Sequence, residues 1–355
     1  MRFTHENLRQ RVVFAPGSSP EATVAEVHSL GADRVMLIAS KREAPQADPI
    51  AAKLPVVLRH EEVVMHVPTD VATRAIAAAA HSDADAVVTV GGGSTTGLGK
   101  AVARATGLPI VAVPTTYAGS EATDVWGLTD GATKTTGTDE TVLPRSIVYD
   151  AALLTSLPAD TAVASGLNAL AHCIDSMWGP RVDPIDRVLA AEGIRALAAG
   201  LNVVCGGPAG SPPDSLDGIE QTLYGAYLGA VAFASAGSGL HHKICHVLGG
   251  MFTLPHAQTH AVVLPHVLAL NGPHAPQAAA RIAAALDCAD AGTGLAALYA
   301  TVGAPTALRD YGMPEAGIAA AIPAVLAAVP ASNPAPITDD VIAALLRAAW
   351  EGAPA

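Results

Sequence analysis

The sequence has few charged side chains, and most of those it has are acidic. Of its 355 residues, 15% are Asp, Glu, Lys or Arg, and the formal net charge is −12 at pH 7. General nucleic-acid binding needs a basic surface, so this balance excludes a nucleic-acid partner. A negatively charged substrate would need a locally positive pocket to enter against this field.

Cysteine is also scarce, and it lacks the spacing of a redox or zinc motif. The four cysteines contain no CxxC pair. We therefore expect reduced thiols in the core of a cytoplasmic protein. The four are Cys173, Cys205, Cys245 and Cys288.

Long hydrophobic runs are missing as well. The first residues, "MRFTHENLRQRVVF", lack the apolar stretch of a signal peptide. Elsewhere the apolar runs are short or are broken by Gly, Pro and charge, so the sequence predicts no transmembrane span and no membrane partner. Half of the residues are apolar. A chain of this length and composition is expected to bury two cores of ordinary size.

The first part of the chain alternates short apolar segments with Ala-rich helical segments. Several of the apolar segments are nearly continuous Val/Ile runs, as in strands that are buried on both faces. This alternation predicts an α/β domain with a doubly wound, mainly parallel sheet over residues 1–157. The expected strands are Arg34–Ser40, Glu62–Pro68, Asp85–Ser94, Leu108–Thr116 and Arg145–Asp150.

The character of the sequence changes after Pro158. Strand signals stop, and long Ala/Leu-rich segments follow to the C-terminus. These segments predict an all-α domain over residues 158–355. The Gly/Pro-rich segment Cys205–Gly218 predicts a break between two of its helices.

A glycine-rich segment, "VTVGGGSTTGLGK", follows the third expected strand. It is neither a GxGxxG nor a P-loop, and by itself it also fits a tight turn without a ligand. Glycines let a pyrophosphate approach the backbone, and the amides of a helix N-terminus bind its charge. A second loop follows the next strand, where a parallel sheet has its binding crevice, and this favours a dinucleotide. The expected cofactor-binding residues here are Gly91, Gly92, Gly93, Ser94, Thr115 and Thr116.

The choice between NADH and NADPH is expected to depend on the end of the first of the expected strands. The residue that reads the adenosine ribose commonly lies there. The chain has Ser40 at this point, followed by Lys41 and Arg42 rather than by Asp or Glu. An acidic side chain would repel a 2′-phosphate, so the sequence predicts that NADPH is accepted alongside NADH.

Histidines concentrate in the second half of the chain. Seven of the thirteen lie between His241 and His274. His242 and His246 are four residues apart and share one helix face. The following Leu-Gly-Gly is expected to end that helix, and His256 comes fourteen residues after His242.

A further pair lies in "GLNALAHCID", which predicts a helix with Asn168 and His172 on one face. Together with His242 and His256, this pair is typical of a metal site. One prospective ligand, however, is an amide where Fe²⁺ or Zn²⁺ is usually bound by a carboxylate or an imidazole.

Taken in order, these motifs resemble the iron-containing alcohol dehydrogenases. The resemblance extends from about residue 10 to at least residue 310. It implies the dehydroquinate synthase-like fold of that family, with an N-terminal dinucleotide domain, a helical domain and a homodimer. The segments that carry it are "GGGS", "PTT…GSE", "GLNALAH", "HHKICHVLGG" and "LPHAQTHAVVLPHVLALN".

Two departures from the metal-dependent members resemble one branch, the maleylacetate reductases. Asn168 stands where those members have an Asp ligand, and Gly97 replaces a second Asp. The branch implies reduction of the carbon–carbon double bond of maleylacetate to 3-oxoadipate, in the degradation of aromatic compounds. NADH or NADPH is the implied reductant, and no metal is expected. An iron- or zinc-dependent alcohol dehydrogenase, and a paralogue that has lost hydride transfer, stay open as alternatives.

The resemblance also implies roles for particular residues. The metal-ligand positions, vestigial in this reading, are Asn168, His172, His242 and His256, and a further functional histidine falls on His246. We expect the catalytic residues to be His246, His242, His172 and Lys243. The expected substrate-binding residues are Asn168, His256 and Tyr117, and Ser40 and Leu153 are expected to complete the cofactor site.

We hypothesise that Asn168 removes a negative charge from a site for a dicarboxylate substrate and leaves the imidazoles free to carry protons. Two segments, Asp175–Trp178 and Ala122–Asp124, depart from the branch. Because both are candidates to line the site, they leave the identity of the substrate less certain than the family.

Overall fold

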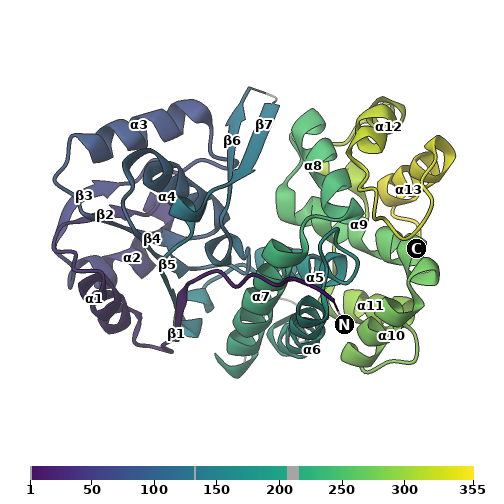
Figure 1. The fold of residues 1–355 in the computed structure, drawn as a ribbon, viewed down its shortest axis with the longest axis horizontal. Helices are drawn as coiled ribbons and strands as arrows, with labels where there is room; N and C mark the ends of the chain where they lie inside the picture. The colour runs from purple at the N-terminus through teal and green to yellow at the C-terminus, as the bar shows by residue number, and fades with distance from the viewer. Residues whose placement is uncertain (1, 132, 206–215) are drawn as a thin grey trace. The chain divides into compact units, whose positions relative to one another are not determined.

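The computed structural model describes residues 2–131, 133–205 and 216–355. The chain divides into an α/β unit, Leu8–Leu157, and a helical unit that joins the residues before Leu8 to Pro158–Ala355. Figure 1 shows both. The predicted N-terminal domain of residues 1–157 therefore wrongly included a short leading segment, which packs with the helices.

The α/β unit contains a six-stranded sheet in the order β1-β8-β5-β4-β2-β3, and every neighbouring pair is parallel. A separate antiparallel hairpin is formed by β6 and β7. The strands are β1 (Arg11–Phe14), β2 (Val35–Ile38), β3 (Val56–His60), β4 (Ala86–Gly91), β5 (Ile110–Pro114), β6 (Val125–Asp130), β7 (Thr133–Thr138) and β8 (Ser146–Tyr149).

Helices cover both faces of this sheet, as Figure 1 shows. Val35 and Leu37 face one core, which contains side chains of α1 (Ser19–Ser29) and α2 (Ala44–Ala51). Met36 and Ile38 face the other, with α3 (Thr69–Ala80) and α4 (Gly93–Thr106). Successive strand side chains point to opposite faces, so a continuous apolar run fills both cores. The predicted doubly wound α/β architecture is confirmed.

Four of the five predicted strands are confirmed, and Glu62–Pro68 is wrong. The third strand is β3, Val56–His60, which ends before that segment begins. In the predicted segment, His66 and Val67 have φ of 66° and 50°. This left-handed conformation is incompatible with an extended strand. The apolar pattern there belongs to a loop that packs Val67 against α3 and α4.

The helical unit has no strand among its described residues. Its helices are α5 (Ala159–Ser176), α6 (Pro184–Cys205), α7 (Leu216–Ala236), α8 (Leu240–Phe252), α9 (His256–Asn271), α10 (Pro276–Ala285), α11 (Ala291–Val302), α12 (Gly317–Ala328) and α13 (Asp339–Glu351). The predicted all-α domain is confirmed. Most of the predicted break at Cys205–Gly218 lies outside the described residues.

Helix α8 does not end at Leu-Gly-Gly. It continues through Gly249 and Gly250 to Phe252, and the left-handed residue that caps it is Thr253, at φ 54°. A glycine ends a helix only where its backbone takes the left-handed conformation. Gly249 and Gly250 stay helical, so the predicted helix end was wrong.

One helix, α6, is long and apolar enough by composition to cross a membrane, and the pair α7 and α8 qualifies only across a 96° bend. Helix α6 nevertheless carries Asp186, Arg187, Glu192 and Arg195. It packs along α5 and α7. A core helix of a soluble protein passes the same test, so α6 is weak evidence for a span.

Candidate active site

Six imidazole rings from three helices gather in the helical unit. The rings of His172 and His242 are 5.1 Å apart between centroids and lie 15° from parallel. Centroid distances are 4.7 Å from His242 to His260 and 4.2 Å from His260 to His256. The cluster consists of His172 on α5, His241, His242 and His246 on α8, and His256 and His260 on α9.

Helical spacing explains how the sequence builds this cluster. Asn168 and His172 lie one turn apart on α5 and are 2% and 8% exposed. The pairs His242–His246 on α8 and His256–His260 on α9 repeat the same four-residue step. Side chains four apart share a face, so three helices each present a pair to the common interior.

Asp175, which the sequence singled out only as part of a divergent segment, binds His242 directly. Its Oδ2 accepts hydrogen bonds from His242 Nδ1 at 2.8 Å and from the Gly239 amide at 2.8 Å. Its Oδ1 accepts one from Trp178 Nε1 at 3.3 Å. An ionised carboxylate can only accept, so Nδ1 of His242 carries the proton and Nε2 has the lone pair. The available signal was spacing, because Asp175 follows His172 by three residues on one helix face.

Burial favours the neutral form of four of the six rings. It lowers the pKa of His172 to about 3 and that of His241 to about 4. It also holds the pKa values of His242 and His260 well below the ordinary value, and neighbouring imidazoles lower them further. Desolvation penalises the charged form of each ring. In the unliganded protein, burial therefore works against the hypothesis that these four imidazoles carry protons.

Several buried polar atoms of the cluster have no hydrogen-bond partner, namely Asn168 Oδ1, His172 Nδ1, His242 Nε2 and both ring nitrogens of His260. Such groups are costly to bury unless a ligand completes them. Asn168 Oδ1 and His242 Nε2 are acceptors without a donor. The ring nitrogens of His172 and His260 are acceptors or donors, depending on which nitrogen carries the proton. The cluster is therefore shaped to receive a ligand.

Asn168 departs from the iron site of the family's metal-dependent members. Asn168 supplies no charge, and the carboxylate in contact with the cluster, Asp175, is already bound to His242, Gly239 and Trp178. In the described part of the chain, the groups of possible ligand atoms that lie within 4.8 Å of one another do not include His172, His242 and His256 as a set.

The predicted cofactor loop lies in the α/β unit. Strand β4 ends at Gly91, and Gly92 caps α4, whose first residues are Gly93 and Ser94. A Cβ on Gly91 would lie 2.3 Å from Thr95 Oγ1. The first amides of a helix have no intrahelical partner, so this N-terminus can bind phosphate oxygens.

The second predicted loop lies directly beside the first. The Thr115 amide donates to the Gly91 carbonyl oxygen at 3.1 Å, and a Cβ on Gly92 would lie 3.0 Å from Thr116 Cγ2. Side chains of Thr95, Glu43 and Thr116 already lie where a Cβ at Gly91 or Gly92 would be, so both positions favour glycine. The residues present fit a dinucleotide. Leu153 lies in a short turn and packs against the core on the α1 and α2 side of the sheet.

Glu43 corrects the prediction that no acid lies at the end of β2. Its carboxylate accepts hydrogen bonds from the Gly92 amide at 3.2 Å, the Ser40 amide at 3.0 Å and Thr95 Oγ1 at 3.4 Å. A 3₁₀ turn over Lys41–Glu43 brings the carboxylate back to the loop. The sequence has Ser40 and Glu43 at the Ser-x-x-Glu spacing of a capping box, which predicts that the Glu43 side chain folds back toward Ser40.

The other predicted residues lie in different surroundings. Tyr117 is 1% exposed within the α/β unit, and Lys243 is half-buried on α8 beside His242. A Cβ on Gly97 would lie 2.9 Å from Val67 Cγ2. The Asp found at this position in metal-dependent members would therefore have to displace Val67.

The two divergent segments have structural roles. Asp175 is fully buried beneath His242, and Trp178 packs against it. In the segment Ala122–Asp124, the Thr123 carbonyl oxygen accepts a 2.8 Å hydrogen bond from the buried Lys100 Nζ. Burial lowers the pKa of Lys100 to about 7. Asp175 therefore binds a residue of α8, His242, and Thr123 binds a residue of α4, Lys100.

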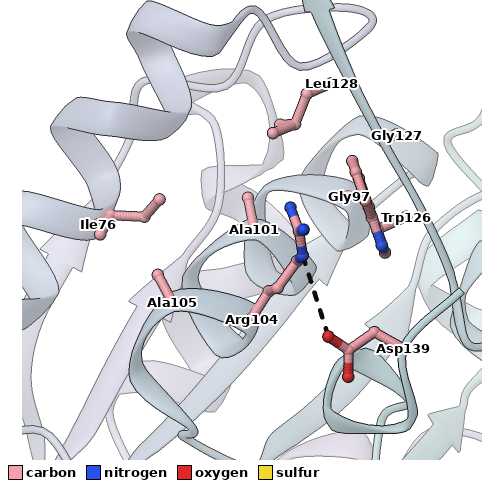
Figure 2. Close-up of a pocket in the computed structure, with 9 residues that line it drawn as sticks. All are labelled: Ile76, Gly97, Ala101, Arg104, Ala105, Trp126, Gly127, Leu128 and Asp139. Atoms are coloured by element: carbon pink, nitrogen blue, oxygen red, sulfur yellow. Dashed lines mark ion pairs between the residues drawn. The ribbon is translucent and has the colours of Figure 1, made fainter. Parts of the chain in front are cut away.

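A separate cavity of about 420 Å³ lies between α3, α4 and the β6–β7 hairpin (Figure 2). Its cationic group, Arg104, points toward Asp139 at 3.9 Å and stacks 3.8 Å over the Trp126 ring. Its lining contains none of the predicted cofactor-binding residues. Because Arg104 is already paired, the cavity gives no argument for a second ligand.

Two family models match the chain. Residues 9–151 match the one described as iron-containing alcohol dehydrogenase. Residues 162–350 match the C-terminal part of the Fe-containing alcohol dehydrogenase family. The matches therefore extend over both units.

Full-length relatives agree with these matches. The chain is 43% identical to the maleylacetate reductase of Sphingobium indicum, covering 100% of this chain and 99% of the relative. It is 46% identical to maleylacetate reductase 2 of Cupriavidus pinatubonensis, covering 96% and 95%. A solved iron-containing alcohol dehydrogenase from Corynebacterium glutamicum is 55% identical, with a TM-score of 0.94 and coverage of 99% and 97%.

Proposed function

The chain belongs to the iron-containing alcohol dehydrogenase family and is an oxidoreductase, and we propose that it reduces the carbon–carbon double bond of maleylacetate with NADH or NADPH to give 3-oxoadipate. The full-length similarity to maleylacetate reductases supports the reaction. The observation that carries the proposal at the site is the buried histidine cluster with an amide, Asn168, in place of a carboxylate.

The α/β unit would hold the cofactor. The amides at the start of α4 and the hydroxyls of Thr115 and Thr116 are the groups suited to the pyrophosphate. When bound, the nicotinamide supplies the hydride. The remaining tasks, which are to bind the substrate, stabilise charge and deliver a proton, belong to the chain's own residues.

Hydride addition to the conjugated double bond places negative charge on the ketone oxygen. Without a metal, hydrogen-bond donors must stabilise that oxygen, and one such donor can contribute about 3–4 kcal/mol. His242 cannot donate in its neutral form, because Asp175 holds its proton on Nδ1. His242 Nε2 is an acceptor, so we assign the donor and proton source to His246.

A dicarboxylate also changes the protonation of the cluster. Its oxygens accept hydrogen bonds only, and they would meet the lone pair of His242 Nε2. Negative charge nearby raises the pKa of a buried imidazole. Substrate binding is therefore coupled to proton uptake, which reconciles a neutral unliganded cluster with an anionic substrate.

The test is NADH oxidation with maleylacetate, with and without a chelator. The proposal requires turnover that the chelator leaves unchanged. Turnover that stops on chelation would refute metal independence alone, and no turnover with either cofactor would refute the reaction.

A second candidate is an iron- or zinc-dependent alcohol dehydrogenase, favoured by the unpartnered Asn168 Oδ1, His172 Nδ1 and His242 Nε2. Three imidazoles are a known zinc donor set. Elemental analysis of the purified protein, together with oxidation of simple alcohols by NAD⁺ in added Fe²⁺ or Zn²⁺, separates the two candidates.

The proposal includes a cytoplasmic location and a homodimer. The mass of the purified protein by light scattering tests the dimer. Fractionation of cells that express the chain tests the location, and recovery in the membrane pellet would count against it.

A further inference from the structure

The segment before Leu8 carries a histidine into the helical unit. His5 reaches the start of α6, where Asp183 and Asp186 lie. The side chains of His5, Asp183 and Asp186 are 6%, 3% and 0% exposed. All three belong to the helical unit. None of them belongs to the histidine cluster, and nothing in the proposed reaction uses them.

Four polar atoms converge at this point. His5 Nδ1 lies 2.7 Å from Asp183 Oδ2 and 3.6 Å from Asp186 Oδ1. The Ser235 hydroxyl lies 3.4 Å from the same nitrogen and also contacts the Asp186 carboxylate. The imidazole and carboxylate ligand atoms all lie within 4.8 Å of one another.

Hydrogen bonds around the group fix its donors and acceptors. His5 Nε2 lies 3.1 Å from Asn7 Oδ1, a carbonyl oxygen that can only accept, so Nε2 carries a proton. Nδ1 lies 2.7 Å from Asp183 Oδ2, which also only accepts, so in the unliganded protein Nδ1 carries a proton too, and a bound ion would replace that proton. Asp186 Oδ2 accepts from the Asp183 amide at 3.1 Å, whereas the fully buried Asp186 Oδ1 has no hydrogen-bond donor.

The charge of this group is not balanced. In the described residues, His5 is the cationic partner that the ion pairs give to Asp183 and Asp186. Two carboxylates and one imidazole leave a negative charge even when His5 is protonated. The amides of Ile185 and Asp186 at the start of α6 donate to Asp183 and offset part of this charge, and a second positive charge would offset the rest.

We propose that His5 Nδ1, Asp183 Oδ2 and Asp186 Oδ1, with the Ser235 hydroxyl, bind a divalent transition-metal ion such as Zn²⁺ or Mn²⁺. For bonds of roughly 2.1 Å, ligand atoms lie about 3.0 to 3.4 Å apart. The observed 2.7, 3.4 and 3.6 Å separations bracket this range. Imidazole and carboxylate together suit these ions, whereas Mg²⁺ prefers oxygen ligands alone.

Asn7 completes the site by orienting the imidazole. A metal-binding histidine usually donates its other ring N–H to an oxygen, which fixes the tautomer. The bound ion joins the leading segment to the start of α6. It stabilises the folded chain by mass action, because the ligands are separated by 178 positions in sequence and meet only after folding.

The test is metal binding by the full chain, produced without a tag, stripped with a chelator and titrated calorimetrically with ZnCl₂ or MnCl₂. All proteins carry His242→Gln, which removes one possible metal ligand from the histidine cluster. Any metal binding that remains in the cluster is then the same in every protein compared. The variant is Asp186→Asn, which keeps the shape and removes the charge. The matched control is Glu192→Gln, an exposed carboxylate on the same helix paired with Arg195.

We expect the parent and Glu192→Gln to bind one equivalent that raises the melting temperature, and MgCl₂ to have no such effect. Asp186→Asn should lose that equivalent, and Asn7→Ala should weaken it by about 10- to 100-fold. Should Asp186→Asn fail to fold, His5→Gln, on the leading segment, tests the same loss. Equal binding by the parent and these variants overturns the proposal and leaves a protonated His5 as the occupant.

Discussion

At the residue scale, Asn168 places a neutral amide beside the histidine cluster. It is 2% exposed, and its Oδ1 has no hydrogen-bond partner. The amide is neutral, so the negative charge in contact with the cluster comes from Asp175, which is bound to His242 Nδ1. We therefore expect the residue at position 168 to decide whether the cluster suits a cation or an anion.

The variant Asn168→Asp tests this assignment. An added carboxylate should repel a dicarboxylate substrate and attract a cation, so we expect kcat/KM for maleylacetate to fall at least 10-fold, which corresponds to about 1.4 kcal/mol. Affinity for Zn²⁺ or Fe²⁺ should rise in the same protein. Full activity without metal binding would show that the charge at this position is irrelevant.

Asp175 is a positioning residue, since it acts through His242. In Asp175→Asn the ring loses its charged acceptor, so we expect kcat to fall about 10- to 100-fold. Loss of the neighbouring negative charge should also move the acidic limb of the pH–rate profile to lower pH.

Trp178→Phe is the matched control for Asp175→Asn. It removes a donor to the same carboxylate and leaves the bond to His242. Its kcat should stay within about 3-fold of the parent, or about 0.7 kcal/mol. Equal losses in both variants, with an unmoved pH profile, would reduce Asp175 to a packing role.

Glu43 gives a further prediction, on cofactor choice. Its carboxylate accepts from the Ser40 amide at the end of β2, where negative charge would oppose a 2′-phosphate. In Glu43→Gln we expect the ratio of kcat/KM for NADPH to that for NADH to rise about 10-fold. Glu61→Gln, at an exposed carboxylate paired with Arg59, should leave the ratio unchanged. An unchanged ratio in Glu43→Gln as well would leave Lys41 and Arg42 as the residues that select the cofactor.

At the element scale, glycines let the helices approach closely. A Cβ on Gly225 of α7 would lie 2.8 Å from the Leu197 amide nitrogen and 2.9 Å from the Gly193 carbonyl oxygen of α6. Both contacts are backbone atoms, so they cannot move without shifting the helix. The α6–α7 pair borders α5, which carries Asn168 and His172.

We expect Gly225→Ala to lower the free energy of unfolding by about 1–3 kcal/mol, as overpacking does. Gly249→Ala is the matched control, because a Cβ there meets no atom within 4 Å and the residue lies inside α8. That change should stabilise the protein by up to about 1 kcal/mol. Urea unfolding measures both, and equal stability changes would contradict the close approach of α6 and α7.

At the scale of the whole molecule, the neutral cluster ties stability to pH. The folded chain holds the pKa of His172 at about 3 and that of His241 at about 4, against 6.5 in the unfolded chain. Between those values the unfolded chain binds more protons, so stability is full above pH 6.5 and falls as the pH drops toward 4. Asp175, whose pKa burial raises to about 6, has the opposite effect but is a single group.

We therefore expect urea unfolding to show a steady loss of stability from pH 6.5 to pH 4.5. His241→Gln, which can keep a donor to the His260 carbonyl oxygen, should reduce the slope by about 1.4 kcal/mol per pH unit, the value for one proton. Stability that is flat across this interval would mean that the buried histidines are already protonated.

Local sequence patterns determined the fold class and most of the elements. Apolar runs between helical segments specify a sheet with two covered faces, because a strand places alternate side chains on each. Four-residue spacing paired Asn168 with His172 and His242 with His246 for the same kind of reason, since a helix turns every 3.6 residues. The strand expected at Glu62–Pro68 failed because a left-handed turn has no signature in hydropathy.

Only the tertiary structure decided which groups meet and in what charge state. Glu43 lies 49 positions from Gly92, Asp175 lies 67 from His242, and His5 lies 178 from Asp183. No local periodicity links residues so far apart, because their contact follows from how whole elements pack. The neutral state of the histidines has the same origin, since it arises from burial that only the assembled helices provide.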